Sequence, residues 1–444
     1  MQQFYLILLV LFLSSCATKE EEVSVEDSAS IEKALYVQEY IKDLDTIPQN
    51  VREYTRQLDS SRKFSQEDFE KKYFKAWNLE KSNISLSNAM WAHNLYKVGN
   101  TYGENLQLLK QEFFDTTLEN GNYEEYGTLN KQAITLKRLN IRAMPTNKPI
   151  LFDPTQAGEG FPFDYLQNSS IAANKPVFVS HYSKDKKWIF IESSFAFGWV
   201  KSASVVIIDK KYTDLWQQAK QIFITKEGIP IYSEDGEFLF KSRIGTMLAL
   251  VAEDEDSYTV LTISKYKNKK PLYIRSQIDK SIAHRGILKF NSKNINKILK
   301  EVSQTNYGWG GIFGQRDCSS TLRDFYTPFG LWLPRNSYQQ SKSGHVISLK
   351  GLSDVDKLSL IKKEAEPFQT LLYKKGHIVL YVGTYKGRVV IYQNVWGVKT
   401  KKEGKEGRFI IGRPIFSTLE VGKNLKYFDK DSSLLHNLKS MTTL

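Results

Sequence analysis

The sequence is poor in the residues that cross-link a fold. Of its 444 residues, two are cysteine and six are histidine. No group of His, Cys, Asp and Glu residues has the spacing of metal ligands, so we predict no metal and no cofactor. One cysteine, Cys16, lies in the N-terminal segment, directly after an apolar run that is discussed below as a signal peptide. The other, Cys318, is then left without a partner for an internal disulfide.

The N-terminal apolar run is too short to cross a bilayer. Residues 4–13 form a run of ten apolar residues, where a membrane-spanning helix needs about 20. Ser14, Ser15, Cys16 and Ala17 follow this run, and the pattern predicts a secretory signal peptide over residues 1–15. The protein is therefore expected to leave the cytoplasm.

The Leu13-Ser-Ser-Cys16 ending resembles the bacterial lipoprotein signal. This resemblance implies that cleavage leaves Cys16 at the N-terminus and that its lipid holds the protein in a membrane. Ala17, the residue after it, favours an outer-membrane location that faces the periplasm. The alternative is an ordinary cleaved signal peptide in which Cys16 has no role.

The sequence contains fewer acidic than basic residues. The formal net charge is +13, and residues 1–15 contribute nothing to it because they contain no charged side chain. Basic surfaces attract polyanions such as nucleic acid, anionic lipid and cell-wall polymer. Secretion and the lack of a nucleic-acid-binding motif exclude nucleic acid as a partner. The hydrophobic content of 41% is enough for several small cores, so we expect three or four modules.

The character of the sequence changes several times along the chain. Polar, charge-dense residues after Cys16 predict a solvated tether. The capping signal Ser65-Gln-Glu-Asp68 and the aromatic residues spaced behind it predict helices with an aromatic core. Short β-rich segments beyond Ile134 predict small barrels. We predict a signal peptide at 1–15, a tether at 16–63, a helical module at 64–139, barrels at 140–210 and 211–286, a catalytic domain at 287–425 and a tail at 426–444.

The first barrel has a recognisable pattern. Trp188 followed by Gly198-Trp199-Val200 resembles bacterial SH3-like domains, while the second barrel resembles one only in the rhythm of its strands. The resemblance implies domains that bind cell-wall peptide or pack beside a catalytic domain. Exposed aromatic side chains there would stack on sugar rings, but most are expected in the barrel cores.

Cys318 is the candidate nucleophile. It follows a glycine-rich stretch that cannot form a regular helix, and the residues after it can propagate one. A thiol at a helix N-terminus is stabilised as thiolate, and the adjacent backbone N–H can face an oxyanion. The alternative is a buried cysteine that only fills space. The polar neighbours Asp317, Ser319 and Ser320 are unusual for a core residue and favour the nucleophile.

His377 is the candidate partner, because it is the first residue of a strand predicted within the segment Gly376–Gly383. It would hold the thiol proton and return it to the leaving amine. The imidazole needs a third polar group to orient it, and Gln393 and Asn394 are the candidates on the neighbouring strand. Because side chains alternate along a strand, only one of the two can face the site.

These residues resemble the NlpC-type, papain-like cysteine peptidases of bacterial cell-wall metabolism. The resemblance lies in the following motifs: Tyr307-Gly-Trp-Gly-Gly311, Arg316-Asp-Cys-Ser319, Leu333-Pro-Arg-Asn-Ser337 with Gln340, Gly376-His-Ile378 and Asn394-Val-Trp-Gly397. It extends outward through the barrels to the helical module, over about residues 64–425. The chain departs from the family pattern at Ser320, where glycine is usual, and at Gln393, where relatives of this subtype carry histidine.

The resemblance implies the reaction and the substrate. Members hydrolyse peptidoglycan stem peptides, usually between γ-D-glutamate and diaminopimelate or lysine. Tyr307, Asp317 and Ser319 are then expected to line the substrate groove. Asp317 would pair with a free amino group of a stem peptide, which favours fragments that lack the glycan. Gln393 can hydrogen-bond to the imidazole but carries no charge, so we expect an active enzyme with a shifted pH profile.

The predicted fold class is α+β: a papain-like domain, with a helix carrying Cys318 packed on an antiparallel sheet carrying His377, preceded by two SH3-like barrels and a helical module. The predicted function is a lipid-anchored peptidoglycan endopeptidase. The alternatives are a catalytically silent wall-binding scaffold and an acyltransferase or amidase on the same fold. Left open are the identity of the diamino acid, cross-linked wall against free peptide, closure of the groove by the first barrel, and the oligomeric state.

Overall fold

The computed structural model describes residues 39–56, 58, 62–267 and 270–444. The predicted signal peptide and Cys16 lie outside the described residues. Ile41–Leu444 form one compact unit. In the part of the chain that is described, no helix is both long enough and apolar enough to cross a membrane.

The helical module begins as the capping signal predicts. Ser65 caps the first helix by accepting a hydrogen bond from the Asp68 N–H. Phe69, Tyr73 and Trp77 are buried, which confirms the interpretation of the aromatic stripe as core. The helices of this module are α4 (Gln66–Tyr73), α5 (Leu86–Ala89), α6 (Trp91–Leu95) and α7 (Gln111–Asn120).

The predicted tether is wrong for the residues from Ile41 onward. Helices α2 (Lys42–Thr46) and α3 (Arg52–Thr55) pack against the catalytic domain. Asp43 accepts hydrogen bonds from the backbone N–H and hydroxyl of Thr418, and the fully buried Tyr54 ring stacks on Phe416 at 4.8 Å. The composition of this segment is polar, but the apolar side chains of Ile41, Ile47 and Tyr54 are buried.

The first barrel begins earlier than the predicted residue 140. Strand β1 (Lys131–Thr135) pairs with β4 and β7, so it belongs to the barrel and not to the helical module. The strand order is β3-β2-β6-β5-β4-β1-β7. The remaining strands are β2 (Leu139–Arg142), β3 (Gln167–Ile171), β4 (Pro176–Tyr182), β5 (Trp188–Ser193), β6 (Phe197–Lys201) and β7 (Val205–Ile207).

The second barrel follows helix α8 (Lys210–Gln218) and is built from an antiparallel five-stranded sheet in the order β13-β12-β11-β8-β14 together with the β9–β10 pair. Its interior contains Ile222, Phe240 and Val260. Its strands are β8 (Gln221–Ile224), β9 (Pro230–Tyr232), β10 (Phe238–Lys241), β11 (Met247–Glu253), β12 (Ser257–Lys267), β13 (Lys270–Asp279) and β14 (Ala283–Arg285).

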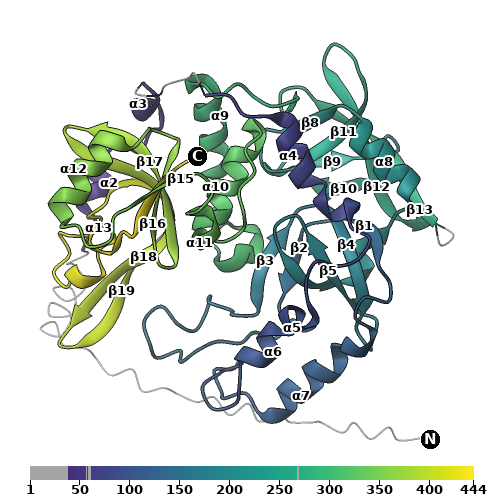
Figure 1. Ribbon diagram of the computed structural model, residues 1–444, viewed down its shortest axis with the longest axis horizontal. Coiled ribbons are helices and arrows are strands. Elements are labelled where there is room, and N and C mark those ends of the chain that lie inside the picture. Colours follow the sequence, from purple (N-terminus) through teal and green to yellow (C-terminus); the bar gives the residue numbers. More distant parts are fainter. Residues whose placement is uncertain (1–38, 57, 59–61, 268–269) are drawn as a thin grey trace, which may run out of the picture. The chain divides into compact units, whose positions relative to one another are not determined.

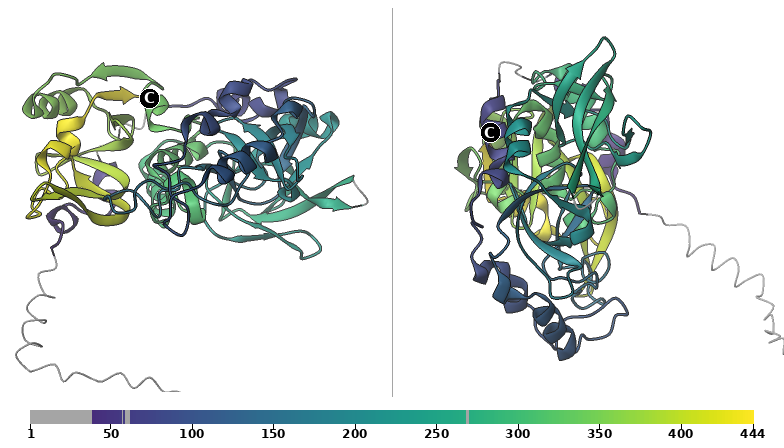
Figure 2. Two further views of the ribbon diagram at one scale, coloured as in Figure 1. Left: turned by 90° about the horizontal axis from the view of Figure 1, so that it is seen from below. Right: turned by 90° about the vertical axis from the view of Figure 1, so that its right-hand side faces the viewer.

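The catalytic domain is an antiparallel six-stranded sheet in the order β15-β20-β16-β17-β18-β19. Helices α9 and α10 cover one face, and α12 and α13 pack on the other (Figures 1 and 2). The helices are α9 (Ser292–Val302), α10 (Cys318–Tyr326), α11 (Ser337–Gln340), α12 (Asp354–Glu364) and α13 (Leu434–Asn437). The strands are β15 (His345–Ser348), β16 (Thr370–Lys374), β17 (His377–Tyr385), β18 (Arg388–Lys402), β19 (Lys405–Thr418) and β20 (Ser440–Thr443).

The predicted C-terminal tail is also wrong. Strand β20 lies inside the sheet, where it pairs with β15 on one side and with β16 on the other. Met441 and Thr442 are buried there. The sheet of the catalytic domain therefore includes β20. Without β20, the edge of β16 would lose its hydrogen-bonding partner.

Candidate active site

The glycine-rich loop before Cys318 is shaped by its contact with the first barrel. Gly310 and Gly311 have φ values of 57° and 79°, which side chains other than glycine rarely adopt. A Cβ atom on Gly310 would lie 2.2 Å from the Gln167 carbonyl oxygen of β3. Gln167 Nε2 also donates to the Gly310 carbonyl at 3.1 Å. The barrel thus supports the loop that leads to Cys318.

Cys318 is the first residue of α10, as the sequence predicts. The helix starts with a capping box: Asp317 Oδ1 accepts from the Ser320 N–H at 2.9 Å, and the Asp317 N–H donates to the Ser320 hydroxyl at 2.9 Å. The departure from glycine at residue 320 therefore supplies one half of the cap. It fixes the direction in which the helix leaves the loop.

The strand that begins with His377 packs against the Cys318 helix. The backbone N–H of Ile378, the residue after His377, favours the charged form of the Cys318 thiol and so acts to lower its pKa. Burial raises the pKa of Cys318 to about 12 and lowers that of His377 to about 4. Burial thus acts against the thiolate that the helix N-terminus is predicted to stabilise, and it favours a neutral thiol and a neutral imidazole.

Gln393 is the residue that contacts the imidazole. His377 Nε2 and Gln393 Oε1 are 2.9 Å apart, and Gln393 Nε2 donates to the Ser417 hydroxyl at 2.8 Å. Ser417 in turn donates to the Thr418 carbonyl, so its oxygen must accept from Gln393. This network places the proton of neutral His377 on Nε2 and leaves Nδ1 free to accept one.

Asn394 faces the other side of the strand. Its amide donates to the Arg316 carbonyl at 2.8 Å and to the Thr321 hydroxyl at 3.0 Å. It therefore ties strand β18 to the start of α10, on the opposite face from the imidazole. The alternation along the strand separates the two candidates as expected.

Arg335 also belongs to the site, although the sequence motif that contains it predicts no role for this residue. Its guanidinium forms a bidentate pair with Asp317, at 2.6 and 3.2 Å, and donates to Ser319 Oγ at 3.0 Å. It also donates to Ser169 of the first barrel at 2.6 Å. The pairing holds the pKa of Asp317 below its usual value although the carboxylate is buried, so Asp317 stays ionised.

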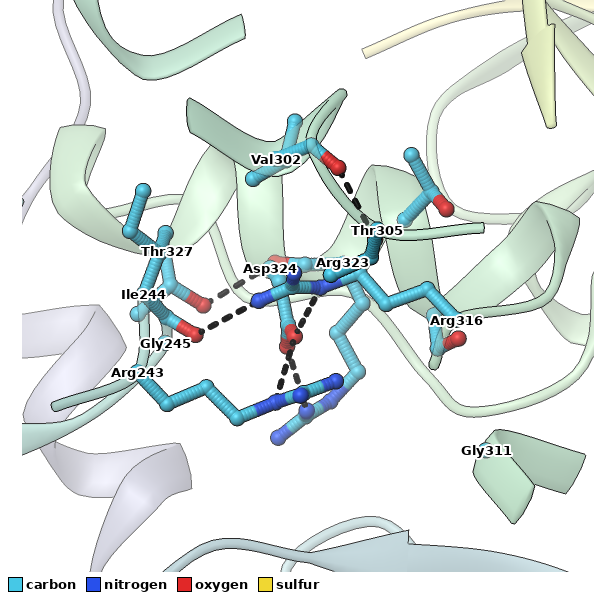
Figure 3. A network of polar contacts seen from close by, with 12 residues as sticks. Arg243, Ile244, Gly245, Val302, Thr305, Gly311, Arg316, Arg323, Asp324 and Thr327 are labelled. Atoms are coloured by element: carbon cyan, nitrogen blue, oxygen red, sulfur yellow. Dashed lines mark hydrogen bonds and ion pairs between the residues drawn. The ribbon is translucent and has the colours of Figure 1, made fainter. Parts of the chain in front are cut away.

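A buried ionic network anchors helix α10, which begins with Cys318, to the second barrel. Asp324 of α10 lies between the guanidinium groups of Arg316, at 2.8 Å, and Arg243, at 3.6 Å (Figure 3). Arg316 is fully buried and also pairs with Glu227 of the barrel at 2.5 Å. Breaking such a pair leaves an uncompensated buried charge. The network therefore holds α10 in position.

Two hollows meet at Tyr307, which lines both. The first, about 730 Å³, is lined by Asp317, Cys318 and Ser319, together with residues 195–197 of the first barrel and Trp91 of the helical module. The second, about 380 Å³, is lined by His377 and Gln393 and by residues of β18 and β19. The first barrel thus forms one wall of the groove on the cysteine side.

The known domains that match this chain occur along it in the same order as the modules of the structure. Family models match an N-terminal NLPC_P60 stabilising domain at residues 5–126, an SH3 domain of the SH3b1 type at 149–201, an SH3 domain of the SH3b2 type at 209–255 and the NlpC/P60 family at 304–400. They confirm the predicted family resemblance and the predicted fold class.

One solved structure shares the fold over almost the whole chain. The NlpC/P60 endopeptidase from Photobacterium damselae subsp. piscicida superimposes with a TM-score of 0.78 at 23% identity, over 90% of this chain and 97% of that one. An NlpC/P60 family protein from Bacillus cereus ATCC 10987 matches with a TM-score of 0.41 at 16% identity, over 62% of this chain and 81% of that one. A comparison with curated proteins gave no match.

Proposed function

We propose that this chain, a cell-wall peptidase that belongs to the NlpC/P60 family, hydrolyses the bond between γ-D-glutamate and the diamino acid of peptidoglycan stem peptides. The observation that carries the proposal is the assembly of Cys318 at a helix N-terminus with His377 held by Gln393. A silent scaffold has no need of an imidazole whose tautomer is fixed for accepting a thiol proton.

The geometry supports a two-step reaction. Cys318 Sγ attacks the γ-carbonyl carbon while its proton passes to His377 Nδ1, and the first-turn N–H groups of α10 stabilise the oxyanion. The C–N bond then breaks, and the imidazolium returns the proton to the leaving amine. Water, deprotonated by His377, hydrolyses the thioester and restores the thiol. Gln393 accepts from Nε2–H throughout and keeps the ring oriented.

The cysteine-side hollow supports a preference for free stem peptides. The first barrel and the helical module both contribute to its lining, so a glycan strand attached to the stem peptide would have to pass beside them. Asp317 is the group that would bind a free amino terminus of the stem peptide, although its carboxylate already accepts hydrogen bonds from Arg335. Among the described residues, Oδ2 accepts only from Arg335, so it keeps the capacity to accept from an ammonium group.

The test is mass spectrometry of sacculi and of soluble stem peptides incubated with residues 20–444. The wild type should release products cut at the γ-D-glutamyl bond, and Cys318→Ala and His377→Ala should not. His345→Ala, at an exposed histidine on β15, is the matched control and should stay active. No cleavage by the wild type, with sacculi still bound, would favour the scaffold. Transfer of the acyl group to an added amine without hydrolysis would favour the acyltransferase.

Lipid anchoring through Cys16 is a separate part of the proposal. It is supported by the lipoprotein-like ending of the signal segment. In cells fed labelled palmitate, the full-length protein should take up label and fractionate with the outer membrane, while Cys16→Ala should take up none. A labelled Cys16→Ala protein would refute this assignment.

A further inference from the structure

The hollow beside His377 lies on the side of the leaving amine. His377 lines it together with Gln393, whereas Cys318 lines the other hollow. Because the imidazole must reach the amine that departs, the diamino acid of the substrate has to occupy the histidine side. The side chains of this second hollow therefore contact whatever distinguishes one diamino acid from another.

Two cations without carboxylate partners among the described residues line this hollow. Lys374 is the last residue of β16 and pairs directly with His377 across the sheet. Arg408 of β19 packs against the backbone of the first barrel, since a Cβ atom on Gly158 would lie 3.0 Å from its Nη2. Lys374 Nζ donates to the Ser432 carbonyl at 3.3 Å. Within the part of the chain that the structure describes, neither cation takes part in an ion pair.

The other charges nearby are accounted for. Lys399 also lines the hollow, but it pairs with Glu406 and lies 3.6 Å from Asp429. Asp431 is at the rim. Burial, followed by the charges of Arg408 and Lys399, lowers the pKa of Lys374, and an arriving carboxylate would relieve that repulsion. As far as the described residues go, the hollow thus offers two unpaired cations and one carboxylate at its rim.

We propose that Lys374 and Arg408 bind the side-chain carboxylate of the departing diamino acid and so select diaminopimelate over lysine. This rests on the proposed function. The side chain of diaminopimelate ends in a carboxylate and an ammonium group, which match the two cations and Asp431 respectively. A lysine side chain ends in an ammonium group alone and would bring a third positive charge beside Lys374 and Arg408. Aromatic side chains of Phe163, Trp396 and Phe428 would flank the methylene chain.

The experiment compares two tripeptides, L-alanyl-γ-D-glutamyl-meso-diaminopimelate and its L-lysine counterpart, with residues 20–444. Wild type should show a kcat/KM ratio of about tenfold or more in favour of diaminopimelate. Lys374→Met and Arg408→Gln should each reduce that ratio about tenfold, mainly through KM, and Lys374→Arg should restore most of it. Lys375→Met, at the exposed neighbour, is the control and should keep the wild-type ratio.

The ratio is insensitive to partial misfolding, because loss of active protein lowers both values of kcat/KM equally. Unchanged ratios in both variants would overturn the proposal, as would a wild type that cleaves the lysine peptide equally well. The proposed function has its own check: wild type should release p-nitroaniline from L-alanyl-γ-D-glutamyl-p-nitroanilide, which has no diamino acid. Failure to cleave the anilide and both peptides would refute the peptidase itself, not the carboxylate subsite alone.

Discussion

Replacing Gln393 with glutamate should move the acidic limb of the pH profile upward. In the wild type, His377 is partly buried with a pKa lowered to about 4 by desolvation, and Gln393 gives it only a neutral hydrogen bond at 2.9 Å. The Gln393→Glu variant would place a carboxylate at that distance. An opposite charge so close raises a histidine pKa by about 1 to 3 units, which corresponds to roughly 1.4 to 4 kcal/mol.

The direction follows from which protonation state reacts. His377 must be neutral to accept the thiol proton, so activity falls as pH drops through its pKa. The wild type should stay active down to about pH 4, whereas Gln393→Glu should lose activity between about pH 5 and 7. Ser417 can rotate its hydroxyl to donate to the new carboxylate, so the fold should accept the change.

The assay is kcat/KM against pH with the p-nitroanilide substrate. Gln107→Glu, an exposed site in the helical module, adds the same charge far from the imidazole and should leave the profile unchanged. An acidic limb that stays in place or moves down in Gln393→Glu would refute the reasoning. A wild type active only in a narrow window below about pH 8 would also refute it, because that window indicates a resting thiolate–imidazolium pair.

Three further predictions concern stability. Ser320→Gly removes one half of the capping box and should lower the free energy of unfolding by about 1 kcal/mol in urea titration, with activity retained. Arg335→Gln leaves Asp317 charged and buried, so it should lower the free energy of unfolding by about 3 kcal/mol or more at neutral pH. The loss should become smaller as the pH falls, because Asp317 then becomes protonated. Urea titrations at several pH values would check this. Deleting residues 440–444 removes β20 from inside the sheet and should abolish cooperative thermal unfolding.

Local signals in the sequence carried a large part of the fold. The Ser65 cap, the glycines before Cys318 and the strand that begins at His377 all act over a few residues. Helix capping, glycine backbone freedom and strand alternation are properties of short segments, so they can be read without a partner. They place Cys318 at the start of a helix and His377 at the start of a strand, where the structure has them.

The predicted tether and the predicted C-terminal tail were wrong because both segments make long-range contacts. Residues 440–443 look like a polar tail until two other strands flank them, and residues 41–55 look like a tether until Tyr54 meets Phe416. Nothing within either segment encodes the partner surface. Boundaries predicted from composition therefore failed where a short segment completes a distant sheet or covers its face.

The sequence by itself determined the order of modules, the elements that carry Cys318 and His377 and the limit of two candidates for the orienting residue. Only the tertiary structure decided that Gln393 faces the imidazole, that Arg335 neutralises Asp317 and that Lys374 and Arg408 share a hollow. The reason is physical: hydrogen bonds, ion pairs and desolvation depend on distances between side chains, and folding alone sets those distances.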